Sequence, residues 1–495
     1  MYFFSDFYYI QNGDFREDFL FCLSILAIFY SNVLRKQIFK DFLLFLYLFY
    51  FVIETTSYIA ISSNFSSSYM FLLIETNQQE LKEFTTSYIN ISTLVFIFLM
   101  IVLFFVFRRM KLVVNASKKI LVSGFVFFGI IVLLKFTGLI ESNAYHNIVR
   151  GTYGYFELQN SVKFNSNISI NDIKTTADNE ILVVVLGEST TSQHMQIYGY
   201  ERKTTPLLYS IKDSLYLYNN VISSDIFTLK TVPKLLTSLD NSSENQVAYN
   251  IVEIFNKVGY KTYWLSNQRA ISYHDNAISK IASNSYEFKF YSHKKDKHTT
   301  VLDEVIFPDY LRILNEPGKK VVFIRIIGTH FDYNKRYPPS YNKFIGSTNA
   351  SKKEKIINYY DNAILYNDFI VYSFIKELQK QNKKSALIYL SDHGENVYDN
   401  TEFFGRSEDV LRKSMFEIPF FVWVSKDFEL PIDFQYKPNR AFMADHTYES
   451  IGHLFGIIYK DMDVNKSIFT KTFKKRKRNV IDNIDYDSYF LNKDD

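Results

Sequence analysis

The clearest chemical signal in this sequence is a pair of neighbouring side chains that follows an apolar run. Asp392 and His393 follow residues 386–390 after a single serine, and those five residues are all aliphatic or aromatic and predict a buried strand. A carboxylate beside an imidazole offers the oxygen and nitrogen atoms that a zinc-like cation prefers. The pair therefore predicts a metal-dependent enzyme. The alternative for this pair alone is a strand-ending turn that contains a hydrogen-bonded histidine.

Two other predicted strands end in side chains of the same chemical kind. Glu188 follows residues 181–186 after a single glycine, and His330 follows residues 321–327 after two residues. Because open α/β sheets gather their functional groups at the carboxyl ends of the strands, we expect these groups and the Asp-His pair at one edge. A carboxylate from one strand and the pair from another give three protein ligands with an open position, as in catalytic zinc sites. Glu188 alone would equally fit an ordinary helix N-cap.

The elements that must position these groups follow a regular pattern beyond residue 180. Short β-rich runs alternate with helical stretches, and the runs lie at residues 181–186, 261–265, 321–327, 386–390 and 420–424. Such alternation is typical of a three-layer α/β/α sandwich with a mostly parallel sheet. We therefore expect a soluble α/β domain over residues 181–495.

The first 140 residues are far more apolar than the rest. Four apolar segments, each near the length that crosses a bilayer, lie at about residues 19–34, 42–61, 91–107 and 120–134. They have no polar faces to turn toward water, so we expect an α-helical transmembrane domain of about four helices over residues 1–140. Residues 141–180 are polar and predict a connector that runs along the membrane surface.

The basic residues between the apolar segments predict how the chain crosses the membrane. Basic side chains gather between the first two segments and between the last two, whereas residues 62–90 contain only Lys82. By the positive-inside rule both basic loops are cytoplasmic, which places residues 62–90 and everything after the fourth segment outside. We expect a multi-pass membrane protein whose soluble domain, with Asp392 and His393, lies in the periplasm or the equivalent outer space. Four crossings with an outward carboxyl end require an outward amino end, or a further span that precedes Met1.

Composition excludes one class of partner and one form of stabilisation. The formal net charge of +4 over 495 residues is too small to indicate a nucleic-acid partner. Cys22 is the only cysteine, so the chain forms no intramolecular disulfide. The basic cluster at residues 471–478 fits contact with anionic lipid headgroups as well as it fits a solvated tail.

Five polar motifs follow one another in the soluble part of the chain. They read Gly-Glu-Ser-Thr at 187–190, Tyr-Gly-Tyr-Glu-Arg-Lys-Thr-Thr-Pro at 198–206, Trp-Leu-Ser-Asn-Gln at 264–268, Gly-Thr-His at 328–330 and Ser-Asp-His-Gly-Glu at 391–395. In this order, behind several apolar segments, they resemble the membrane-bound phosphoethanolamine transferases of Gram-negative envelopes, within the alkaline phosphatase and sulfatase superfamily. The resemblance covers nearly the whole chain and implies a sulfatase-type fold for the soluble domain.

This resemblance implies a nucleophile. The family's nucleophile is a threonine five residues before a proline, which is Thr228 before Pro233 here, although Thr231 competes on chemistry alone. A threonine hydroxyl needs a metal to lower its pKa before it attacks. A helix that begins near Ser224 or Asp225 would add amide groups for phosphate oxygens.

The same resemblance implies a zinc-dependent transfer in two displacements. Thr228 would attack the phosphorus of phosphatidylethanolamine, diacylglycerol would leave, and lipopolysaccharide would take phosphoethanolamine from the threonine at a core heptose or at lipid A. His330 matches a histidine near the phosphate, and Asn267 matches a polar position in the substrate pocket. One zinc ion is implied and a second is left open; the ligands of the first would be Glu188, Thr228, Asp392 and His393.

Two departures from the family pattern bear on the acceptor and on the nucleophile segment. Glu417 stands where members that act on lipid A commonly carry a histidine, so it is a candidate substrate-binding residue and favours a core-sugar acceptor. Ser224 and Lys234 stand where many relatives have a disulfide that braces the nucleophile segment. Outside the motifs, His194 follows Glu188 by six residues; it could face the same cleft, but we expect it on the surface of a helix.

Three other functions fit parts of this pattern. A phosphatase or sulfatase of the same superfamily is one, although no Cys/Ser-x-Pro-x-Arg setting accompanies Thr228. A phosphoglycerol transferase would also use a threonine, so only the donor lipid distinguishes it from a phosphoethanolamine transferase. A non-catalytic membrane scaffold would keep the fold and would work without the Thr228 hydroxyl.

Overall fold

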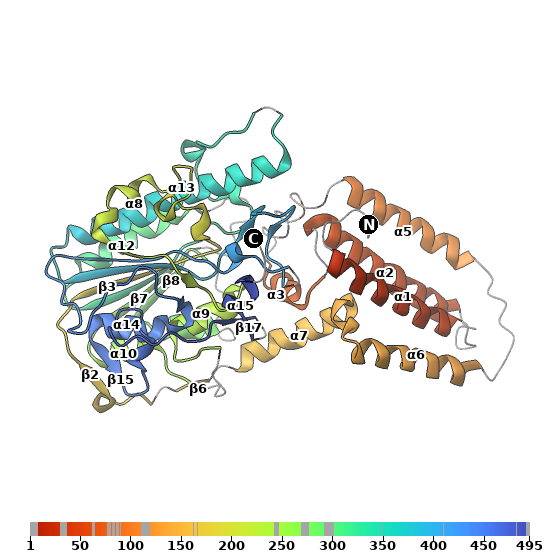
Figure 1. The fold of residues 1–495 in the computed structure, drawn as a ribbon, viewed down its shortest axis with the longest axis horizontal. Helices are drawn as coiled ribbons and strands as arrows, with labels where there is room; N and C mark the ends of the chain where they lie inside the picture. Colours follow the sequence, from red (N-terminus) through yellow and green to blue (C-terminus); the bar gives the residue numbers. More distant parts are fainter. Residues whose placement is uncertain are drawn as a thin grey trace. The chain divides into compact units, whose positions relative to one another are not determined.

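The computed structural model describes most of the chain in ranges that are separated by short gaps. These ranges are residues 8–29, 37–61, 65–76, 81, 85, 89, 91–109, 119–161, 163–165, 167–241, 247–268, 277–291, 301–347, 349–408, 410–481 and 483–491. The chain forms two compact units, Met1–Glu157 with Ser407–Val410, and Leu158–Arg406 with Leu411–Asp495. Figure 1 shows that the first unit is helical and that the second contains a sheet covered by helices.

The first unit consists of apolar helices. They are α1 (Tyr8–Phe29), α2 (Gln37–Ile61), α3 (Ser67–Glu75), α5 (Ile91–Arg109) and α6 (Lys119–Phe136), and α7 (Ala144–Ser161) follows them. Within the described ranges, Gln37–Ile59 and Ile91–Arg109 are long and apolar enough to cross a membrane, and Leu121–Phe136 is a shorter apolar helix. The first half of α1 contains Asp14, Arg16, Glu17 and Asp18, so α1 is less apolar than α2 and α5.

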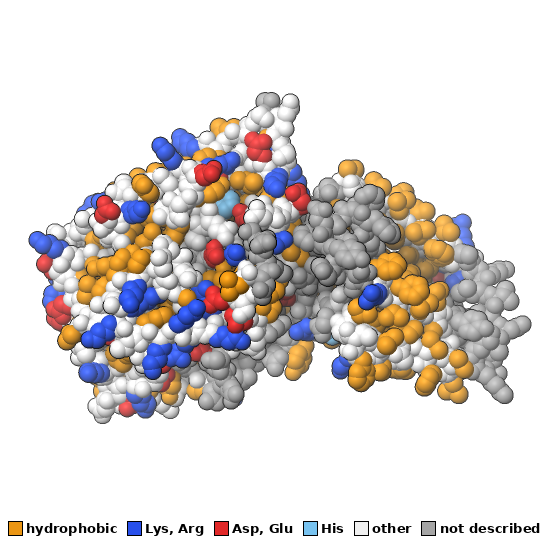
Figure 2. Space-filling model, viewed as in Figure 1, with side chains coloured by type: hydrophobic (Ala, Val, Ile, Leu, Met, Phe, Trp, Pro, Cys, Tyr) orange, Lys and Arg blue, Asp and Glu red, His pale blue; other side chains and the backbone are white. Residues whose placement is uncertain are grey.

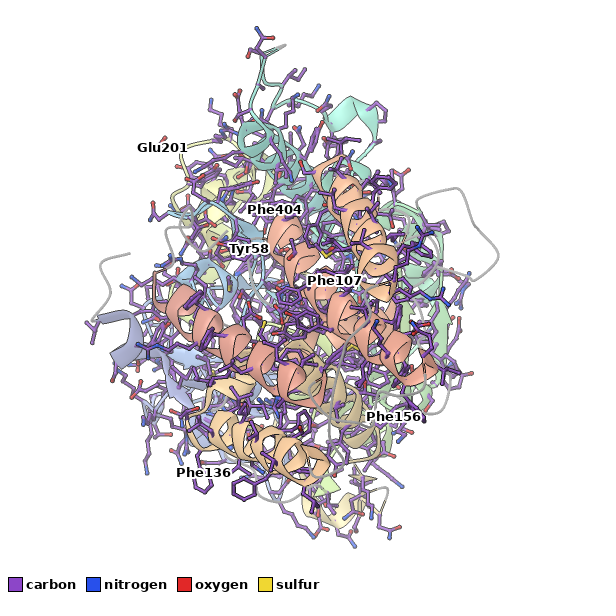
Figure 3. All side chains as sticks on the ribbon, turned by 90° about the vertical axis from the view of Figure 1, so that its right-hand side faces the viewer. Tyr58, Phe107, Phe136, Phe156, Glu201 and Phe404 are labelled. Atoms are coloured by element: carbon purple, nitrogen blue, oxygen red, sulfur yellow. The ribbon has the colours of Figure 1, made fainter. Side chains whose placement is uncertain are left out.

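The surface of these helices is strongly apolar. Hydrophobic side chains gather over them in Figure 2, and Figure 3 shows Phe107 on α5 and Phe136 on α6. Phe136 is 87% exposed, which is costly in water and favourable in lipid. The predicted segments 42–61 and 91–107 lie in α2 and α5, whereas residues 30–34 and most of the basic residues between segments lie outside the described ranges. Four membrane crossings therefore stay a prediction.

The second unit is organised around a seven-stranded sheet. Its strand order is β4-β13-β10-β3-β9-β7-β8, and β13 alone runs against the other six. The sequence runs at 181–186, 261–265, 321–327, 386–390 and 420–424 form its five inner strands, whereas the two short edge strands were not predicted. The bounds are β3 Ile181–Gly187, β4 Leu215–Tyr218, β7 Lys261–Ser266, β8 Glu287–Phe290, β9 Lys320–Arg325, β10 Ser385–Ser391 and β13 Phe420–Val424.

Strand register brings the predicted chemical groups to one edge of this sheet. β3 lies between β10 and β9, with Gly187 opposite Ser391 and Leu186 opposite Arg325. β7 ends with Ser266 opposite the same Arg325. Because these strands are parallel and end at the same level, the residues that follow them meet at the carboxyl edge.

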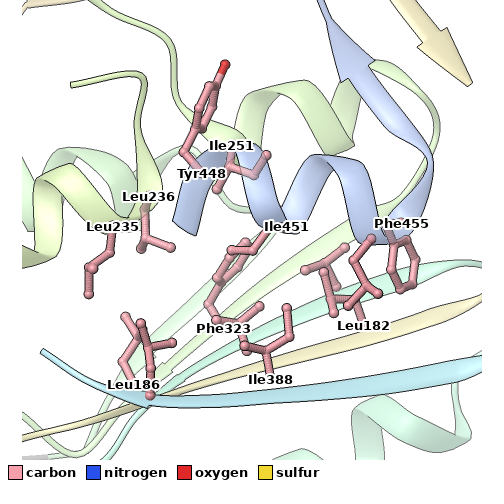
Figure 4. Packing of buried hydrophobic residues seen from close by; sticks show 14 of the residues in the cluster. Leu182, Leu186, Leu235, Leu236, Ile251, Phe323, Ile388, Tyr448, Ile451 and Phe455 are labelled. Carbon is pink, nitrogen blue, oxygen red and sulfur yellow. The ribbon is translucent and has the colours of Figure 1, made fainter. Parts of the chain in front are cut away.

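Helices cover both faces of the sheet, as Figure 1 shows. One face carries α9 (Thr228–Leu236), α10 (Ile251–Lys257), α11 (Ala277–Ser283) and α14 (Thr447–Phe455), and the other carries α8 (Pro206–Ser210), α12 (Phe307–Asn315) and α13 (Lys352–Gln379). In Figure 4, Leu182, Phe323 and Ile388 of the strands pack against Ile451 and Phe455 of α14. The expectation of a three-layer α/β sandwich behind apolar helices is confirmed.

Short strand pairs and a last helix attach further segments to this frame. β5 (Val221–Ile222) pairs with β14 (Phe442–Met443) just before the predicted nucleophile, and β11 (Asn396–Val397) pairs with β12 (Phe404–Gly405) just after the Asp-His pair. The remaining elements are β1 Lys163–Phe164 with β6 Val247–Ala248, β2 Ile173–Thr175 with β15 Ile457–Tyr459, β16 Asn479–Val480 with β17 Ile484–Asp485, and α15 Tyr486–Leu491.

Candidate active site

Three buried side chains converge at the carboxyl edge of the sheet. Glu188 follows β3, and Asp392 and His393 follow β10, so the register of these strands places them together. One ligand atom from each of the three lies within 4.8 Å of the others, and all three side chains are buried. Two carboxylates and an imidazole at this spacing form a set that suits a divalent cation.

The Thr228 hydroxyl lies in the middle of this set. Its Oγ1 is 2.9 and 3.1 Å from the two carboxylate oxygens of Glu188, 2.7 Å from Asp392 Oδ2 and 3.2 Å from His393 Nε2. A hydroxyl has one proton, so it can donate to only one of these four acceptors. The remaining oxygens of Glu188 and Asp392 are electron-rich atoms that face one another in a buried site, and a cation among them would lower the cost of this arrangement. The donor set therefore fits a metal ion.

His393 is oriented for this role by its own backbone neighbourhood. Its Nδ1 lies 2.8 Å from the carbonyl oxygen of Gly394, and a proton on Nδ1 leaves the Nε2 lone pair of the neutral ring directed at the set. Metal-binding histidines are commonly fixed in this way through the second ring nitrogen. Burial lowers the pKa of His393, but the charge of Asp392 and contact with Glu188 outweigh it and raise the pKa above its usual value.

The two carboxyl groups differ in their affinity for protons. Burial acts to raise the pKa of Glu188, but the hydrogen bond and charge of His393, with His330 and Arg325, hold it well below its usual range. Burial and the neighbouring charge of Glu188 raise the pKa of Asp392 to about 6. Glu188 is therefore the firmly ionised ligand, and Asp392 loses its proton near neutral pH.

Strained and close-packed turns set the site's geometry. Ser189 takes a left-handed φ of 56°, and its N–H donates to Asp392 Oδ1 at 3.1 Å, while its carbonyl accepts from the Tyr360 hydroxyl at 2.8 Å. Gly328 also has a positive φ, and a Cβ there would lie 3.2 Å from both the N and the O of Glu188. The turn toward His330 therefore passes against the turn that carries Glu188, and only glycine fits this approach.

The nucleophile segment differs from the prediction in where its helix begins. α9 starts at Thr228 itself and not near Ser224 or Asp225. Asp225 Oδ1 accepts the N–H groups of Ile226 at 2.8 Å and Phe227 at 3.2 Å, so its side chain closes a turn before the helix. Thr228 consequently occupies the first helical position. Thr231 is buried, and its hydroxyl donates to the carbonyl of Phe227 at 3.2 Å.

Of the three predicted substrate-binding residues, His330 lies beside the set. Its Nδ1 is buried without a hydrogen-bond partner among the described residues. Removal from water lowers its pKa to about 3, against the opposing charge of Glu188, so the ring is neutral at physiological pH. A neutral imidazole whose Nδ1 has no partner in the described part of the chain has a nitrogen available for a substrate group.

The other two predicted substrate-binding residues have different partners. Asn267 Nδ2 donates to Asp303 Oδ1 at 2.9 Å, and Asp303 also accepts the N–H groups of Ile327 and Gly328. It therefore supports the turn after β9. Glu417 accepts from Gln193 Nε2 and from the Tyr486 hydroxyl, both at 2.8 Å. Neither residue is in the group of three that the described residues bring within metal-binding distance.

Sequence reasoning missed three residues that do contact the set. Gln268 Nε2 donates to Glu188 Oε2 at 2.9 Å and its Oε1 accepts from Arg325, whose guanidinium lies 3.9 Å from Glu188. Arg406 Nη1 lies 2.6 Å from His393 Nε2 and donates to the carbonyl of Ile226 at 2.9 Å. Gln268 could have been noticed because it follows Asn267 in the same motif, and Arg325 because it is a charged residue in the apolar strand β9. No such signal in the sequence pointed to Arg406.

His194 was expected on a helix surface, and that expectation is wrong. It is buried in a 3-10 turn, Ser192–His194, with Nδ1 2.7 Å from Asp361 Oδ1 and Nε2 3.0 Å from Asp399 Oδ1. Both carboxylates come from segments far away in sequence, α13 and the loop after β11. The ring therefore ties the segment after Glu188 to the rest of the site.

A hydroxyl among side chains that could hold a metal ion, at the carboxyl edge of an α/β sheet, is an arrangement suited to the hydrolysis or transfer of charged esters. Residues 180–457 match the sulfatase family, described simply as sulfatase, and the chain belongs to that family. The chain is 28% identical over 482 residues to phosphoethanolamine transferase EptC of Escherichia coli (strain K12), which covers 87% of this chain and 83% of that protein.

Two solved structures show the same architecture. The zinc complex of the C-terminal periplasmic domain of EptC from Escherichia coli is 30% identical, covers 64% of this chain and 95% of that chain, and superposes with a TM-score of 0.60. The integral membrane lipooligosaccharide phosphoethanolamine transferase EptA of Neisseria meningitidis covers 90% of this chain and 89% of that one, with a TM-score of 0.69 and 17% identity. At that identity the second likeness concerns the fold, including its apolar helices.

Proposed function

We propose that this protein transfers phosphoethanolamine from phosphatidylethanolamine to lipopolysaccharide, with Thr228 as the nucleophile. The observation that carries the proposal is the position of Thr228 Oγ1, 2.7–3.2 Å from four acceptor atoms of Glu188, Asp392 and His393. A relative aligned over 87% of the chain is named a phosphoethanolamine transferase, which supports the donor group. The buried back-bonded hydroxyl of Thr231 supports Thr228 over its competitor.

One zinc ion would complete this site. Glu188, Asp392 and His393 would hold it together with the oxygen of Thr228, and a relative's domain 30% identical to this one crystallises as a zinc complex. When bound, zinc lowers the pKa of a coordinated hydroxyl and offsets charge on phosphoryl oxygens. The second ion that the sequence left open gains no support, because Glu417 is hydrogen-bonded to Gln193 and Tyr486.

The chain's own residues account for two balanced displacements. Thr228 Oγ1 gives up its proton and bonds to phosphorus, and the bond from phosphorus to the diacylglycerol oxygen breaks as that oxygen takes a proton. An acceptor hydroxyl then gives up its proton and bonds to phosphorus, and the bond from phosphorus to Thr228 Oγ1 breaks as that oxygen takes a proton, which returns Thr228 to the free alcohol. His330 stays neutral and accepts a hydrogen bond from the incoming hydroxyl, and Arg406 contributes positive charge beside the phosphoryl oxygens.

The lipid donor requires a place at a membrane. α2 and α5 are long and apolar enough to cross one, and the likeness to the membrane protein EptA extends over 90% of the chain. We therefore propose a multi-pass protein of the bacterial inner membrane with its catalytic domain in the periplasm. Residues 1–140 would form the membrane domain, residues 141–180 the connector and residues 181–495 the catalytic domain. A glutamate at 417 favours a core sugar over lipid A as the acceptor.

Intact-mass analysis of lipopolysaccharide tests this function. Glycolipid is compared from cells with the native gene, without it, with Thr228→Ala and with Thr231→Ala. Loss of one phosphoethanolamine in the null and Thr228→Ala strains only, with fragmentation that places it on core sugar or lipid A, is the expected result. Identical glycolipids in all four strains would refute a lipopolysaccharide acceptor. A glycerol phosphate in place of phosphoethanolamine would instead establish the phosphoglycerol transferase.

A further inference from the structure

A small basic cleft lies outside the active site, between the segment around β14 and the basic cluster at residues 471–478. It measures about 190 Å³, including the part open to solvent. The ionisable residues that line it are all of the basic type, and no carboxylate is among them. Its lining is Ala441, Met443, His446, Phe473, Lys474, Arg476 and Arg478.

Two cations of the cleft, Arg476 and Arg478, pair with carboxylates that are not part of its lining. Arg476 Nη2 is 2.5 Å from Asp463 Oδ2, and Arg478 pairs with Asp487 while its Nη1 donates to Asn220 Oδ1 at 2.6 Å. Such pairing fixes the planar guanidinium groups and lowers the entropic cost of binding an anion. These ion pairs also leave the cleft with a smaller net charge than its lining residues alone suggest.

The other two basic residues of the cleft, Lys474 and His446, have polar atoms that could bind a further group. The Lys474 side chain is exposed and has no ion pair among the described residues. His446 is 8% exposed, and its Nδ1 lies 3.3 Å from Asp445 Oδ1 without a hydrogen bond to it, so this nitrogen is buried and unpartnered in the described structure. A buried polar atom without a partner costs free energy that a bound oxygen atom would recover.

Both walls of the cleft are attached to the segment that leads to the nucleophile. Met443 is the register partner of Ile222 in the β5–β14 pair, six residues before Thr228. The turn Ala444–His446 packs against α9, which Thr228 begins. On the other wall, Arg478 donates a hydrogen bond to Asn220, the residue directly before β5. A group bound in the cleft therefore sits on the same structural layer as the nucleophile.

We propose that this cleft binds a phosphate group of the acceptor glycolipid while the acceptor's hydroxyl reaches the phosphorylated Thr228. The inference rests on the proposed function and names a feature that a good acceptor must have. Guanidinium and ammonium groups that gather with His446 around one small cleft fit the oxygens of a phosphate, and the cleft is too small for a whole headgroup. The donor's own phosphate is already bound at Thr228, so a second phosphate site serves the other substrate.

The test separates the two half-reactions with the full-length protein in detergent micelles. Lys474→Glu reverses the one cleft cation that has no ion pair among the described residues. Lys426→Glu is the matched control, because this exposed lysine follows β13, which ends at the opposite edge of the sheet. Intact protein mass after incubation with phosphatidylethanolamine measures the first half-reaction. Turnover with glycolipid acceptor, either native or stripped of its phosphates, measures the second.

The expected result is confined to the second half-reaction. Lys474→Glu raises the KM for native acceptor roughly tenfold, leaves kcat and phosphoenzyme formation unchanged, and has no effect on stripped acceptor, whereas Lys426→Glu changes nothing. An equal KM for native and stripped acceptor in the unaltered protein overturns the inference. A raised KM of Lys474→Glu for stripped acceptor, seen when the micelles contain phosphatidylglycerol, would also overturn the inference. That result would assign the cleft to anionic phospholipid. Absence of phosphoenzyme in the unaltered protein would instead refute the proposed function itself.

Discussion

Gln268 offers the sharpest test of how the metal-binding set is held. Its amide nitrogen donates to Glu188 Oε2 at 2.9 Å and to the carbonyl of Ile326 at 2.9 Å, and its amide oxygen accepts from Arg325. One side chain therefore fixes the orientation of the most firmly ionised ligand. Gln268→Met keeps the length of the side chain and removes every one of these hydrogen bonds.

The size of the effect follows from the hydrogen bond to the carboxylate. A hydrogen bond to a charged group contributes about 1.5–3 kcal/mol, and each 1.4 kcal/mol is a factor of ten in an equilibrium constant. We therefore expect Gln268→Met to weaken zinc binding roughly 10- to 100-fold, the range typical for residues that orient metal ligands. Competition with a chromophoric chelator, on purified full-length protein, measures this affinity directly.

A matched substitution controls for the loss of a buried amide. Gln193 Nε2 donates to Glu417 Oε2 at 2.8 Å, so Gln193→Met removes the same kind of hydrogen bond away from the metal-binding set. Zinc affinity of that variant should stay within twofold of the unaltered protein. If Gln268→Met also stays within twofold, Arg325 has closed its 3.9 Å gap to Glu188 and replaced the amide, and the positioning role of Gln268 is refuted.

Three further outcomes follow from the site. Thr228→Ala should abolish the phosphoenzyme mass yet retain zinc measured by metal analysis, and Thr228→Ser should restore part of that mass. Loss of zinc in both variants would contradict zinc binding by Glu188, Asp392 and His393 alone. Arg406→Gln should lower transfer roughly 10²- to 10³-fold, while zinc affinity holds or rises because Arg406 Nη1 and the metal share His393 Nε2; weaker zinc binding would be inconsistent with this. Burial acts to lower the pKa of His194, but hydrogen bonds to Asp361 and Asp399 outweigh it and raise the pKa to about 9. The stability that the charged ring adds to the fold is therefore full below about pH 6.5 and lost toward pH 9. The melting-temperature gap to His194→Gln should shrink across that window, and a constant gap would disprove it.

The sequence was informative wherever one strand decided the outcome. Buried parallel strands are continuous apolar runs, so the five inner strands of the sheet were visible, and the residues directly after them had to meet at one edge. Glu188, Asp392 and His393 belong to this class. The edge strands β4 and β8 have only four residues each, and β8 is mostly not buried, so both are too short to stand out in the sequence.

The missed features depend on contacts between distant segments. His194 is buried because carboxylates from α13 and from the loop after β11 reach it, and neither is near it in sequence. The amide of Asn267 turns toward Asp303, while its neighbour Gln268 turns toward Glu188. The motif that contains both spans the end of β7, and its sequence did not reveal which amide faces the site. The start of α9 was displaced because the Asp225 side chain takes up two backbone N–H groups before the helix begins.

The charges that contact one another at the site favour a particular state of the donor. Three carboxylates, Glu188, Asp392 and Glu395, lie with two guanidinium groups, Arg325 and Arg406, which leaves one net negative charge when all are ionised. A bound zinc dication would change this to one net positive charge, and the anion of a phosphodiester would then bring the buried group to neutrality. A phosphomonoester dianion would leave an uncompensated charge in a site from which water is largely removed, and that is costly. The balance thus favours a lipid phosphodiester as donor, and a transferase over a phosphatase.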